Sequence, residues 1–307
     1  MTHIRIATRR SPLALWQAEY ISAELQRLDP TVTTELVKIV TKGDKILDVP
    51  LAQVGGKGLF TKEIDAALLD GRADIAVHSM KDVPTELPAG TAIRAHPKRE
   101  DPRDAIATIS EGGLESLPEG ATIGTSSLRR IAQIQARFPH FKFTSIRGNI
   151  QTRLSKLGFE VDAVILAAAG VKRMGMADQM HDFIDTEILL PAVAQGTLGV
   201  QTRDADDVIN ALVDQLNDAD TVVRTRAERA FLARLEGGCQ VPIAAFARLD
   251  GDSLHLKGLV GAVDGSRLIV RETTGNRSDA ENMGTTLADE VLAAGGREIL
   301  EALYAEG

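Results

Sequence analysis

The chain of 307 residues has a single cysteine, Cys239, which excludes an internal disulfide and any zinc site built from several cysteines. It has no long apolar run either. The longest, 163–171, lies between Asp162 and Lys172 and is far too short to cross a bilayer. Residues 1–10 lack the apolar core of a secretory signal. These absences together predict a protein of the reducing cytoplasm that does not enter a membrane.

Positive charge is also scarce overall. Lys and Arg number 35 against 43 Asp and Glu, a net charge of −8, which argues against non-specific binding to nucleic acid. Any basic site must therefore be a local cluster. The hydrophobic content of 44% and the charged content of 25% are those of a soluble globular protein, and the length allows two or three domains.

The stretch 73–84, ADIAVHSMKDVP, is the first candidate for a site. A helical pattern over 59–70 precedes it, and the apolar run 75–77 predicts a buried strand of a parallel sheet. Ligands of open α/β sheets bind beyond the carboxyl ends of the strands, which is where polar residues follow this run. Those residues are His78, Ser79, Lys81 and Asp82.

Asp82 has two interpretations at this stage. Pro84 keeps Val83 extended, which predicts that Asp82 lies on a loop and not inside a following helix. Asp82 is then either a group for chemistry or a turn cap that pairs with Lys81. The stretch alone favours neither.

Strand and helix patterns alternate over the first two thirds of the chain, which predicts an α/β fold with parallel sheets and helices on both faces. Ser11 and Pro12 are typical of the cap and the first turn of a helix. Residues 41–48 are expected to form a polar loop. Strands are expected at 4–8, 36–40, 122–124, 142–146 and 163–168, and further helices at 128–138 and 150–157.

The pattern changes near the C-terminus. The segments 243–249, 254–263 and 267–272 alternate apolar and polar residues, and Asp-Gly pairs typical of hairpins separate them. Two helical stretches follow, at 279–294 and 297–304. This part is predicted to be a separate α+β domain with a three-stranded antiparallel sheet.

Cationic residues gather in four turns that are expected to join a strand to a helix, at 9–11, 125–130, 147–149 and 172–173. Free N–H groups and the helix dipole make such turns attractive to anions. Arg129 and Arg130 oppose the dipole unless an anion or a carboxylate compensates them. An internal ion pair is the simpler interpretation of any one arginine, but four such turns together favour a ligand with many negative groups.

Cys239 follows two glycines and precedes Gln240, Val241 and Pro242, which predicts an exposed loop. Most lone cysteines are small buried hydrophobes, but a thiol on such a loop can be a nucleophile or an attachment point. No histidine lies near it in the sequence. The residues alone leave both interpretations open.

With these pieces together, the chain resembles the porphobilinogen deaminase family, also called the hydroxymethylbilane synthases. The resemblance runs nearly end to end, in ordered motifs. They are IATRRSPLALWQA at 6–18, GGKGLFTKE at 55–63, ADIAVHSMKDVP at 73–84, REDPRDA at 99–105, IGTSSLRR at 123–130, RGN at 147–149 and ERAFLARLEGGCQVP at 228–242.

The resemblance implies three domains, with a crossing between domains near 99–105. The first is residues 1–97 with 196–215, the second 98–195, and the third 216–307. The first two are implied to look like the lobes of periplasmic binding proteins, with mainly parallel sheets. The third is implied to be α+β and to carry the cysteine.

The resemblance also implies a transferase of porphyrin and haem biosynthesis, in which Cys239 holds a dipyrromethane cofactor through a thioether. Four porphobilinogen molecules are joined to it head to tail, each with loss of ammonia, and water releases the linear tetrapyrrole hydroxymethylbilane. The product is implied to pass to uroporphyrinogen-III synthase. The protein is implied to be a cytoplasmic monomer that needs no metal and binds neither nucleic acid nor membranes.

Residue roles follow from the matching motifs. Asp82 is implied to be the catalytic carboxylate, which stabilises positive charge on the ring N–H of an azafulvene formed from the substrate. Each pyrrole carries an acetate and a propionate, which accounts for many cationic turns. The implied cofactor-binding residues are Cys239, Lys81, Asp82, Ser127, Arg129 and Arg130, and the implied substrate-binding residues are Arg9, Ser11, Thr125, Arg147, Asn149, Arg153, Arg173 and Gln195.

The chain departs from the family pattern at three positions. Gln53 stands where a lysine is frequent, Ala194 where a glycine is common, and Gln201 where a glutamate is common. Ala194 and Gln201 are expected near the return crossing into the first domain. These departures put details of the hinge in question more than the activity.

Two other classes compete with this one. A solute-binding protein or an effector domain on a two-lobed fold would account for the cationic turns, but not for Cys239, the third domain or the missing export signal. An acyltransferase with a cysteine nucleophile lacks an obvious general-base histidine near Cys239.

Overall fold

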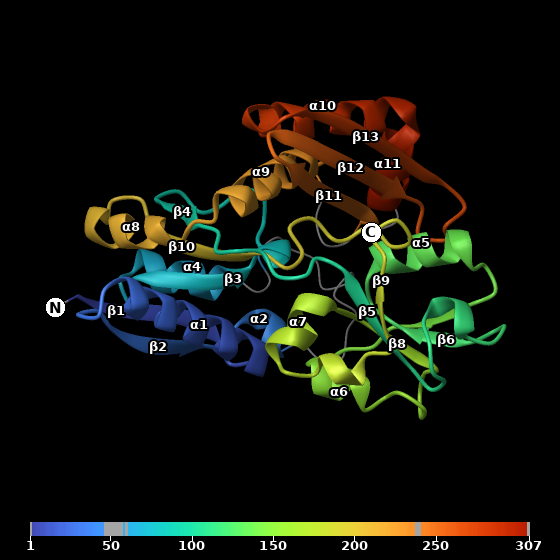
Figure 1. The fold of residues 1–307 in the computed structure, drawn as a ribbon, viewed down its shortest axis with the longest axis horizontal. Helices are drawn as coiled ribbons and strands as arrows, with labels where there is room; N and C mark the ends of the chain where they lie inside the picture. The colour runs from blue at the N-terminus through green and yellow to red at the C-terminus, as the bar shows by residue number, and fades with distance from the viewer. Residues whose placement is uncertain (1, 46–57, 59–60, 237–240, 306–307) are drawn as a thin grey trace. The chain divides into compact units, whose positions relative to one another are not determined.

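The structure is a computed structural model that describes residues 2–45, 58, 61–236 and 241–305 (Figure 1). The chain divides into two compact units. The first holds the described residues within 1–48, 56–100 and 197–222, and the second holds those within 101–196 and 223–307. Among the residues that the structure describes, no helix is both long and apolar enough to span a membrane.

A five-stranded sheet forms the centre of the first unit, in the order β2-β1-β3-β10-β4. β1 pairs in parallel with β2 and β3, whereas β10 is antiparallel to β3 and β4. Leu198 pairs with Ser79, so the residues that begin β10 lie beside the residues that end β3. The strands are β1 (His3–Arg9), β2 (Thr33–Ile39), β3 (Ile75–Ser79), β4 (Thr91–Ala95) and β10 (Leu198–Arg203).

Helices cover both faces of this sheet. Val77 of β3 packs on one face with Ile21 of α1 and Ile209 of α8. Ala76, the preceding residue, packs on the other face with Leu68 of α4, as the alternation of a strand requires. The helices are α1 (Pro12–Leu28), α2 (Lys42–Lys45), α4 (Lys62–Leu69) and α8 (Asp207–Val213).

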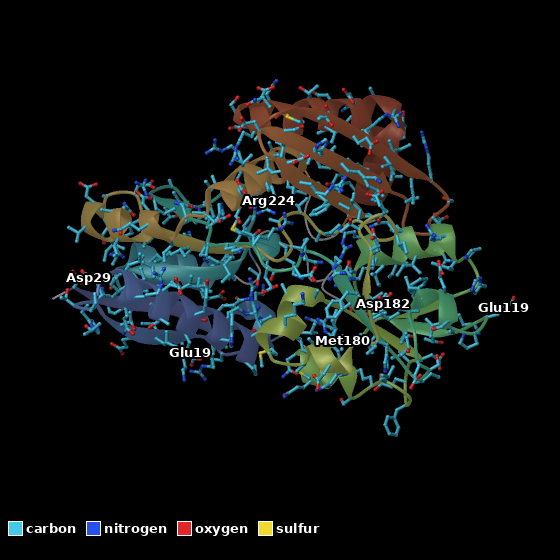
Figure 2. The ribbon with its side chains drawn as sticks, viewed as in Figure 1. Glu19, Asp29, Glu119, Met180, Asp182 and Arg224 are labelled. Atoms are coloured by element: carbon cyan, nitrogen blue, oxygen red, sulfur yellow. The ribbon has the colours of Figure 1, made fainter. Side chains whose placement is uncertain are left out.

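The second unit contains a five-stranded sheet with the same arrangement, in the order β7-β6-β8-β5-β9. β6 is parallel to β7 and β8, and β5 is antiparallel to β8 and β9. Asp182, labelled in Figure 2, begins the edge strand β9. The strands are β5 (Asp104–Thr108), β6 (Thr122–Gly124), β7 (Lys142–Thr144), β8 (Ala163–Ala167) and β9 (Asp182–Ile184).

The helices of the second sheet also lie on both of its faces. Ile134 of α5 packs with Ile123 on one face, and Val171 of α7 packs with Val164 on the other. These two helices follow β6 and β8 directly, so their first turns lie at the carboxyl ends of those strands. The helices are α5 (Leu128–Arg137), α6 (Ile150–Leu154) and α7 (Ala168–Arg173).

The C-terminal part of the second unit is an antiparallel sheet of three strands, as the hairpin signals predict. Its central strand contacts α9, where the ring of Phe231 occupies the space that a side chain at Gly258 would need. The strands are β11 (Ile243–Asp250), β12 (Ser253–Gly261) and β13 (Leu268–Asn276), and the helices are α9 (Ala219–Arg234), α10 (Ala280–Val291) and α11 (Arg297–Ala305).

The fold confirms the predicted two-lobed α/β architecture with a three-stranded C-terminal sheet, and it differs in detail. Each of the five-stranded sheets has two parallel and two antiparallel pairings, so the sheets are mixed where mainly parallel ones were expected. The antiparallel strand β10 lies beside β3 and β4, whose residues come more than a hundred positions earlier in the chain, and local patterns do not predict such pairings. The expected polar loop 41–48 contains the short helix α2.

Candidate active site

In the first unit, the polar residues after β3 form a fixed turn. Met80–Asp82 is a single turn of 3₁₀ helix, where a loop was expected, and Val83 is extended (φ −85°, ψ 125°) as its place before proline predicts. Gln17 Nε2 donates to Ser79 Oγ at 2.9 Å, and Met80 N donates to Thr197 O at 3.0 Å. Asp82 is exposed on a turn held from two sides.

Arg9 lies at the carboxyl end of β1, with an internal partner. Its Nε donates to Asp44 Oδ1 at 3.1 Å, and Thr41 Oγ1 donates to Asp44 Oδ2 at 2.8 Å. Burial raises the pKa of Asp44, but the hydrogen bonds from Arg9 and Thr41 outweigh it, so the pKa lies below its ordinary value. Ser11 caps α1 by accepting from Ala14 N at 3.3 Å, as predicted.

In the second unit, Arg129 and Arg130 meet on one buried carboxylate, that of Asp104. Arg129 Nη2 lies 2.8 Å from Asp104 Oδ2, and Arg130 Nη2 lies 2.6 Å from Oδ1. Gln195 Nε2 donates to the same Oδ1 at 3.0 Å. The internal ion pair that was considered for a single arginine is therefore present for both.

The charges of this cluster do not cancel. Burial raises the pKa of Asp104, but Arg129 and Arg130 outweigh it and lower the pKa to about 2, so the carboxylate is ionised. Two guanidinium groups then face one carboxylate, with side-chain exposures of 5%, 6% and 0%. A buried excess of positive charge at the first turn of α5 favours an anion near this turn.

The turn before α5 supplies hydroxyl groups. Thr125 Oγ1 accepts from Ser127 N at 3.2 Å, which shapes the turn. Ser127 holds the N-cap position, but its side chain does not make the capping hydrogen bond. The hydroxyl of Ser11 caps its helix by accepting a hydrogen bond, whereas the hydroxyl of Ser127 does not cap α5.

A second tight turn precedes α6. Gly148 has φ 109°, and a Cβ there would lie 2.6 Å from the Thr152 side chain, so the turn requires glycine. Asn149 accepts from Thr152 N at 2.9 Å as the N-cap. Arg153 Nε donates to Gly148 O at 2.9 Å, and Arg147 is half-buried where the turn begins.

The prediction for Lys172 and Arg173 is wrong in its geometry. Both residues lie in the last turn of α7, not in a turn that opens a helix. Cations are favourable at a helix C-terminus, which explains their place without a ligand. Arg173 Nη2 donates to Gly196 O at 2.7 Å, and Lys172 Nζ lies 2.7 Å from Asp101 Oδ2.

Two carboxylates that carry much of this arrangement were not among the predicted site residues. Asp101 and Asp104 lie in the REDPRDA motif, where the chain enters the second unit, and Gln195 and Gly196 lie where it leaves. Arg129 and Arg130 of α5 bind Asp104 in the entering segment. In α7, Lys172 binds Asp101 of the entering segment and Arg173 binds Gly196 of the leaving segment. Acidic and basic residues alternate along this motif in the sequence. Carboxylates in a segment that crosses between units need cationic partners, so this alternation could have marked Asp101 and Asp104 as site residues. Cys239 and Gln53 lie outside the described residues.

The donors present suit a ligand with several carboxylates. The second unit, taken by itself, offers the excess charge around Asp104 and the arginines of the RGN turn. The first unit, taken by itself, offers Lys81 next to the exposed Asp82. Guanidinium groups bind carboxylates in two-pronged fashion, and an exposed carboxylate can face a ring N–H. The donors within the second unit are therefore of the kind that the acetate and propionate groups of a dipyrromethane need.

Several solved structures are similar to part of this chain. A putative methionine-binding lipoprotein from Bacillus subtilis is 12% identical, with 72% of this chain and 92% of that chain covered and a TM-score of 0.43. The substrate binding domain of a putative molybdenum ABC transporter from Clostridium difficile is 11% identical (72% and 94% covered, TM-score 0.45). The periplasmic aliphatic sulphonate binding protein from Escherichia coli is 14% identical (77% and 71% covered, TM-score 0.42).

The fold and the site together define a two-lobed α/β protein with a separate C-terminal sheet and buried excess cations. Two family models match it almost from end to end. Residues 4–211 match "Porphobilinogen deaminase, dipyromethane cofactor binding domain", and residues 222–293 match "Porphobilinogen deaminase, C-terminal domain". The chain belongs to the porphobilinogen deaminase family and is a transferase of porphyrin biosynthesis with a dipyrromethane cofactor, as the motifs predict.

Proposed function

We propose that this chain joins four porphobilinogen molecules head to tail, with loss of one ammonia for each, and releases linear hydroxymethylbilane by hydrolysis. The observation that carries the proposal is Asp82, an exposed carboxylate on a fixed turn at the carboxyl end of β3. Membership of the porphobilinogen deaminase family supports the substrate. The exposure of Asp82 supports contact with it.

Asp82 has a defined task in this reaction. Loss of ammonia from the aminomethyl group leaves an azafulvene, whose positive charge is shared with the ring N–H. A carboxylate that faces this N–H stabilises the charge and can accept or return the proton, an effect usually worth several kcal/mol. The hydrogen bonds at Ser79 and Met80 fix the turn before the charge develops, so the carboxylate need not reorganise.

The cations have a second task, which is to hold the acetate and propionate groups of the pyrrole rings. The residues that we assign to the cofactor are Lys81, Asp82, Ser127, Arg129 and Arg130, and to the substrate Arg9, Ser11, Thr125, Arg147, Asn149, Arg153, Arg173 and Gln195. Several of them already have internal partners, such as Arg9 with Asp44. Arg153, which donates to Gly148 O, also holds the turn on which Arg147 lies.

Cys239 is proposed as the attachment point of the dipyrromethane, because a thioether needs a thiol and the chain has one cysteine. When bound, the dipyrromethane supplies the first two rings, to which further pyrroles are added. A thiolate is a suitable nucleophile for an electron-poor carbon. The family match to a cofactor-binding domain supports this assignment.

The remaining assignments are part of the same proposal. The protein acts in the cytoplasm as a monomer and passes its product to uroporphyrinogen-III synthase. Its domains are residues 1–97 with 196–215, 98–195 and 216–307. The boundary of the compact units after Glu100 supports the first division, whereas the second unit holds the other two domains together.

The test is to incubate the purified protein with porphobilinogen and to measure ammonia release and the tetrapyrrole formed. The proposal predicts one ammonia per porphobilinogen consumed and a linear product that closes to a porphyrinogen on standing. Asp82→Asn protein is the control for background reaction. Tight binding of porphobilinogen without any ammonia release would instead support the solute-binding class.

A further inference from the structure

Glu228 of α9 has a buried carboxylate to which the proposed reaction assigns no role. Its exposed fraction is 0%. Oε2 accepts a hydrogen bond from Ala194 N at 2.6 Å, and Oε1 accepts one from Ala247 N at 2.9 Å. Ala194 lies in the segment between β9 and β10, and Ala247 lies in β11. One side chain therefore holds the backbone of two other segments of the same unit.

The hydrogen bond to Ala194 acts on a strained turn. Gln195 N donates to Ala192 O at 2.9 Å, which closes a four-residue turn. Ala194 is its third residue and has φ 57°. A positive φ at this position, as in type II turns, is usually supplied by glycine. An alanine favours the negative φ that a flip of the peptide between Val193 and Ala194 would give. The N–H that Glu228 accepts belongs to this peptide, so the hydrogen bond opposes the flip directly.

The residue that ends this turn lies on the buried ion cluster. Gln195 Nε2 donates to Asp104 Oδ1 at 3.0 Å, and Asp104 is the carboxylate that Arg129 and Arg130 share. A flip of the peptide before Gln195 would rotate the backbone of the turn and draw this amide away from Asp104. A continuous series of contacts thus runs from the carboxylate of α9, through the turn, to the two arginines.

We propose that Glu228 is a positioning residue, which holds the turn at Ala194 in its left-handed form and so keeps Gln195 on the carboxylate that the two arginines share. This inference rests on the proposed function, which assigns Gln195 and these arginines to the pyrrole rings. The role of Glu228 is larger with alanine at position 194 than with glycine, because glycine adopts a positive φ without strain. Glu228 acts through the turn and needs no contact of its own with the substrate.

Glu228→Gln is the informative substitution, because it keeps the size of the side chain and leaves one oxygen to accept from two N–H groups. Pairing with β12 holds β11, whereas the peptide at Ala194 is free to flip, so the turn should lose its partner. KM for porphobilinogen should then rise about tenfold, while kcat changes by less than about threefold because Asp82 belongs to the other unit. Glu119→Gln, at an exposed position of the same unit (Figure 2), removes the same charge and should change neither constant.

Two glycine substitutions in the Glu228→Gln protein separate positioning from general damage. Ala194→Gly should return KM to within about threefold of the wild type, because glycine keeps the positive φ without the hydrogen bond. Ala192→Gly adds similar freedom to the same turn, but at a residue whose φ is not positive, and should leave KM high. Loss of a merely structural hydrogen bond would not distinguish the two glycines.

NMR observes the hydrogen bond itself, without turnover. Val193 and Ala194 form the one Val-Ala pair of the sequence, so valine labelled with ¹³C at its carbonyl and alanine labelled with ¹⁵N together select the Ala194 amide. We expect a downfield amide proton that exchanges slowly in the wild type and in Glu119→Gln. In Glu228→Gln the signal should move upfield, and its exchange should become about tenfold faster or more.

Three results would overturn the inference. They are a wild-type Ala194 amide that exchanges as fast as exposed amides, a wild-type KM in Glu228→Gln, and equal KM values in the two double variants. If Glu228→Gln alone does not fold, the inference predicts that adding Ala194→Gly restores folding and that adding Ala192→Gly does not. A wild-type protein with the expected amide signal that never consumes porphobilinogen would contradict the proposed function itself. The two failures are therefore distinguishable, since the amide signal does not depend on turnover.

Discussion

Arg130 Nη2 lies 2.6 Å from Oδ1 of Asp104 in the interior of the second unit, and the side chain of Asp104 is fully buried. Arg129 approaches the other oxygen of the same carboxylate. Burial lowers the pKa of Arg129, and the charge of Asp104 opposes this effect. The carboxylate is therefore the group that allows two guanidiniums to be buried side by side.

Asp104→Asn should destabilise the protein by about 3–5 kcal/mol, because it leaves buried guanidinium groups without their carboxylate. The measurement is urea unfolding followed by circular dichroism. Asp214→Asn breaks the exposed pair of Arg94 and Asp214 and serves as the control, with an expected cost of about 0–1 kcal/mol. Equal effects of the two substitutions would show that the buried cluster does not stabilise the fold.

The same carboxylate predicts a pH dependence. The pKa of Asp104 is lowered to about 2 in the folded protein, below its ordinary value of 3.8, so its stabilising effect is fully present above about pH 4. That effect, about 2 kcal/mol, is lost as pH falls towards 2. The difference in stability between wild type and Asp104→Asn should narrow over this interval. A difference that stays constant down to about pH 2 would contradict the assignment.

Ala194→Gly should change stability by less than about 0.5 kcal/mol, although Ala194 is buried. Ala194 has φ 57°, a conformation that costs a residue with a Cβ about 1–2 kcal/mol. Glycine relieves this strain, which stabilises the folded state. This gain offsets two losses of stability, the burial of the methyl group and the greater conformational entropy of the unfolded chain. Ala192→Gly, which relieves no such strain, should cost about 0.4–1 kcal/mol in the same unfolding assay, because glycine adds freedom to the unfolded chain. Equal losses at both positions would contradict this account.

Asp82→Asn should keep the fold while turnover of porphobilinogen falls about 10²–10⁴-fold, because the shape is retained and the charge is not. Asp82 is exposed, so its replacement should leave thermal unfolding nearly unchanged. The rate of ammonia release measures the effect. A folded Asp82→Asn protein with a near-normal rate would remove Asp82 from the catalytic role.

Arg147→Ala should interrupt growth of the product at a particular length, because each added pyrrole brings new carboxylates that need a cation. Mass spectrometry of the protein during turnover should show one or two species in excess. Arg147 is the better choice than Arg173, whose loss would also free Gly196 O at the crossing. Arg137→Ala, on an exposed face of α5, is the control. A uniform slowing of every step would contradict staged binding.

Much of the fold could be predicted from local signals. Pro12 after Ser11, the apolar run 75–77 and the Asp-Gly hairpins each depend on neighbours in the sequence, and the structure contains the elements that they predict. The antiparallel place of β10 beside β3 could not be predicted in this way. It depends on residues more than a hundred positions apart.

The site was harder to predict because its internal partners come from the crossing segments. The sequence predicts Arg129 and Arg130 as cations at a helix start, but it does not show that Asp104 faces both. Ala194 illustrates the opposite case. The sequence shows alanine where glycine is common, and the positive φ of Ala194 explains why glycine suits this position.

The intact mass of the purified protein tests the central claim most directly. Protein made in a haem-synthesising cell should be heavier than its sequence by two deaminated pyrrole units, and the adduct should survive denaturation and thiol reductants because a thioether is not opened as a disulfide is. Small additions of porphobilinogen should give steps of one pyrrole unit, and Cys239→Ala should show neither adduct nor steps. Wild-type protein without an adduct and without steps, even after reconstitution with preformed tetrapyrrole, would contradict the account.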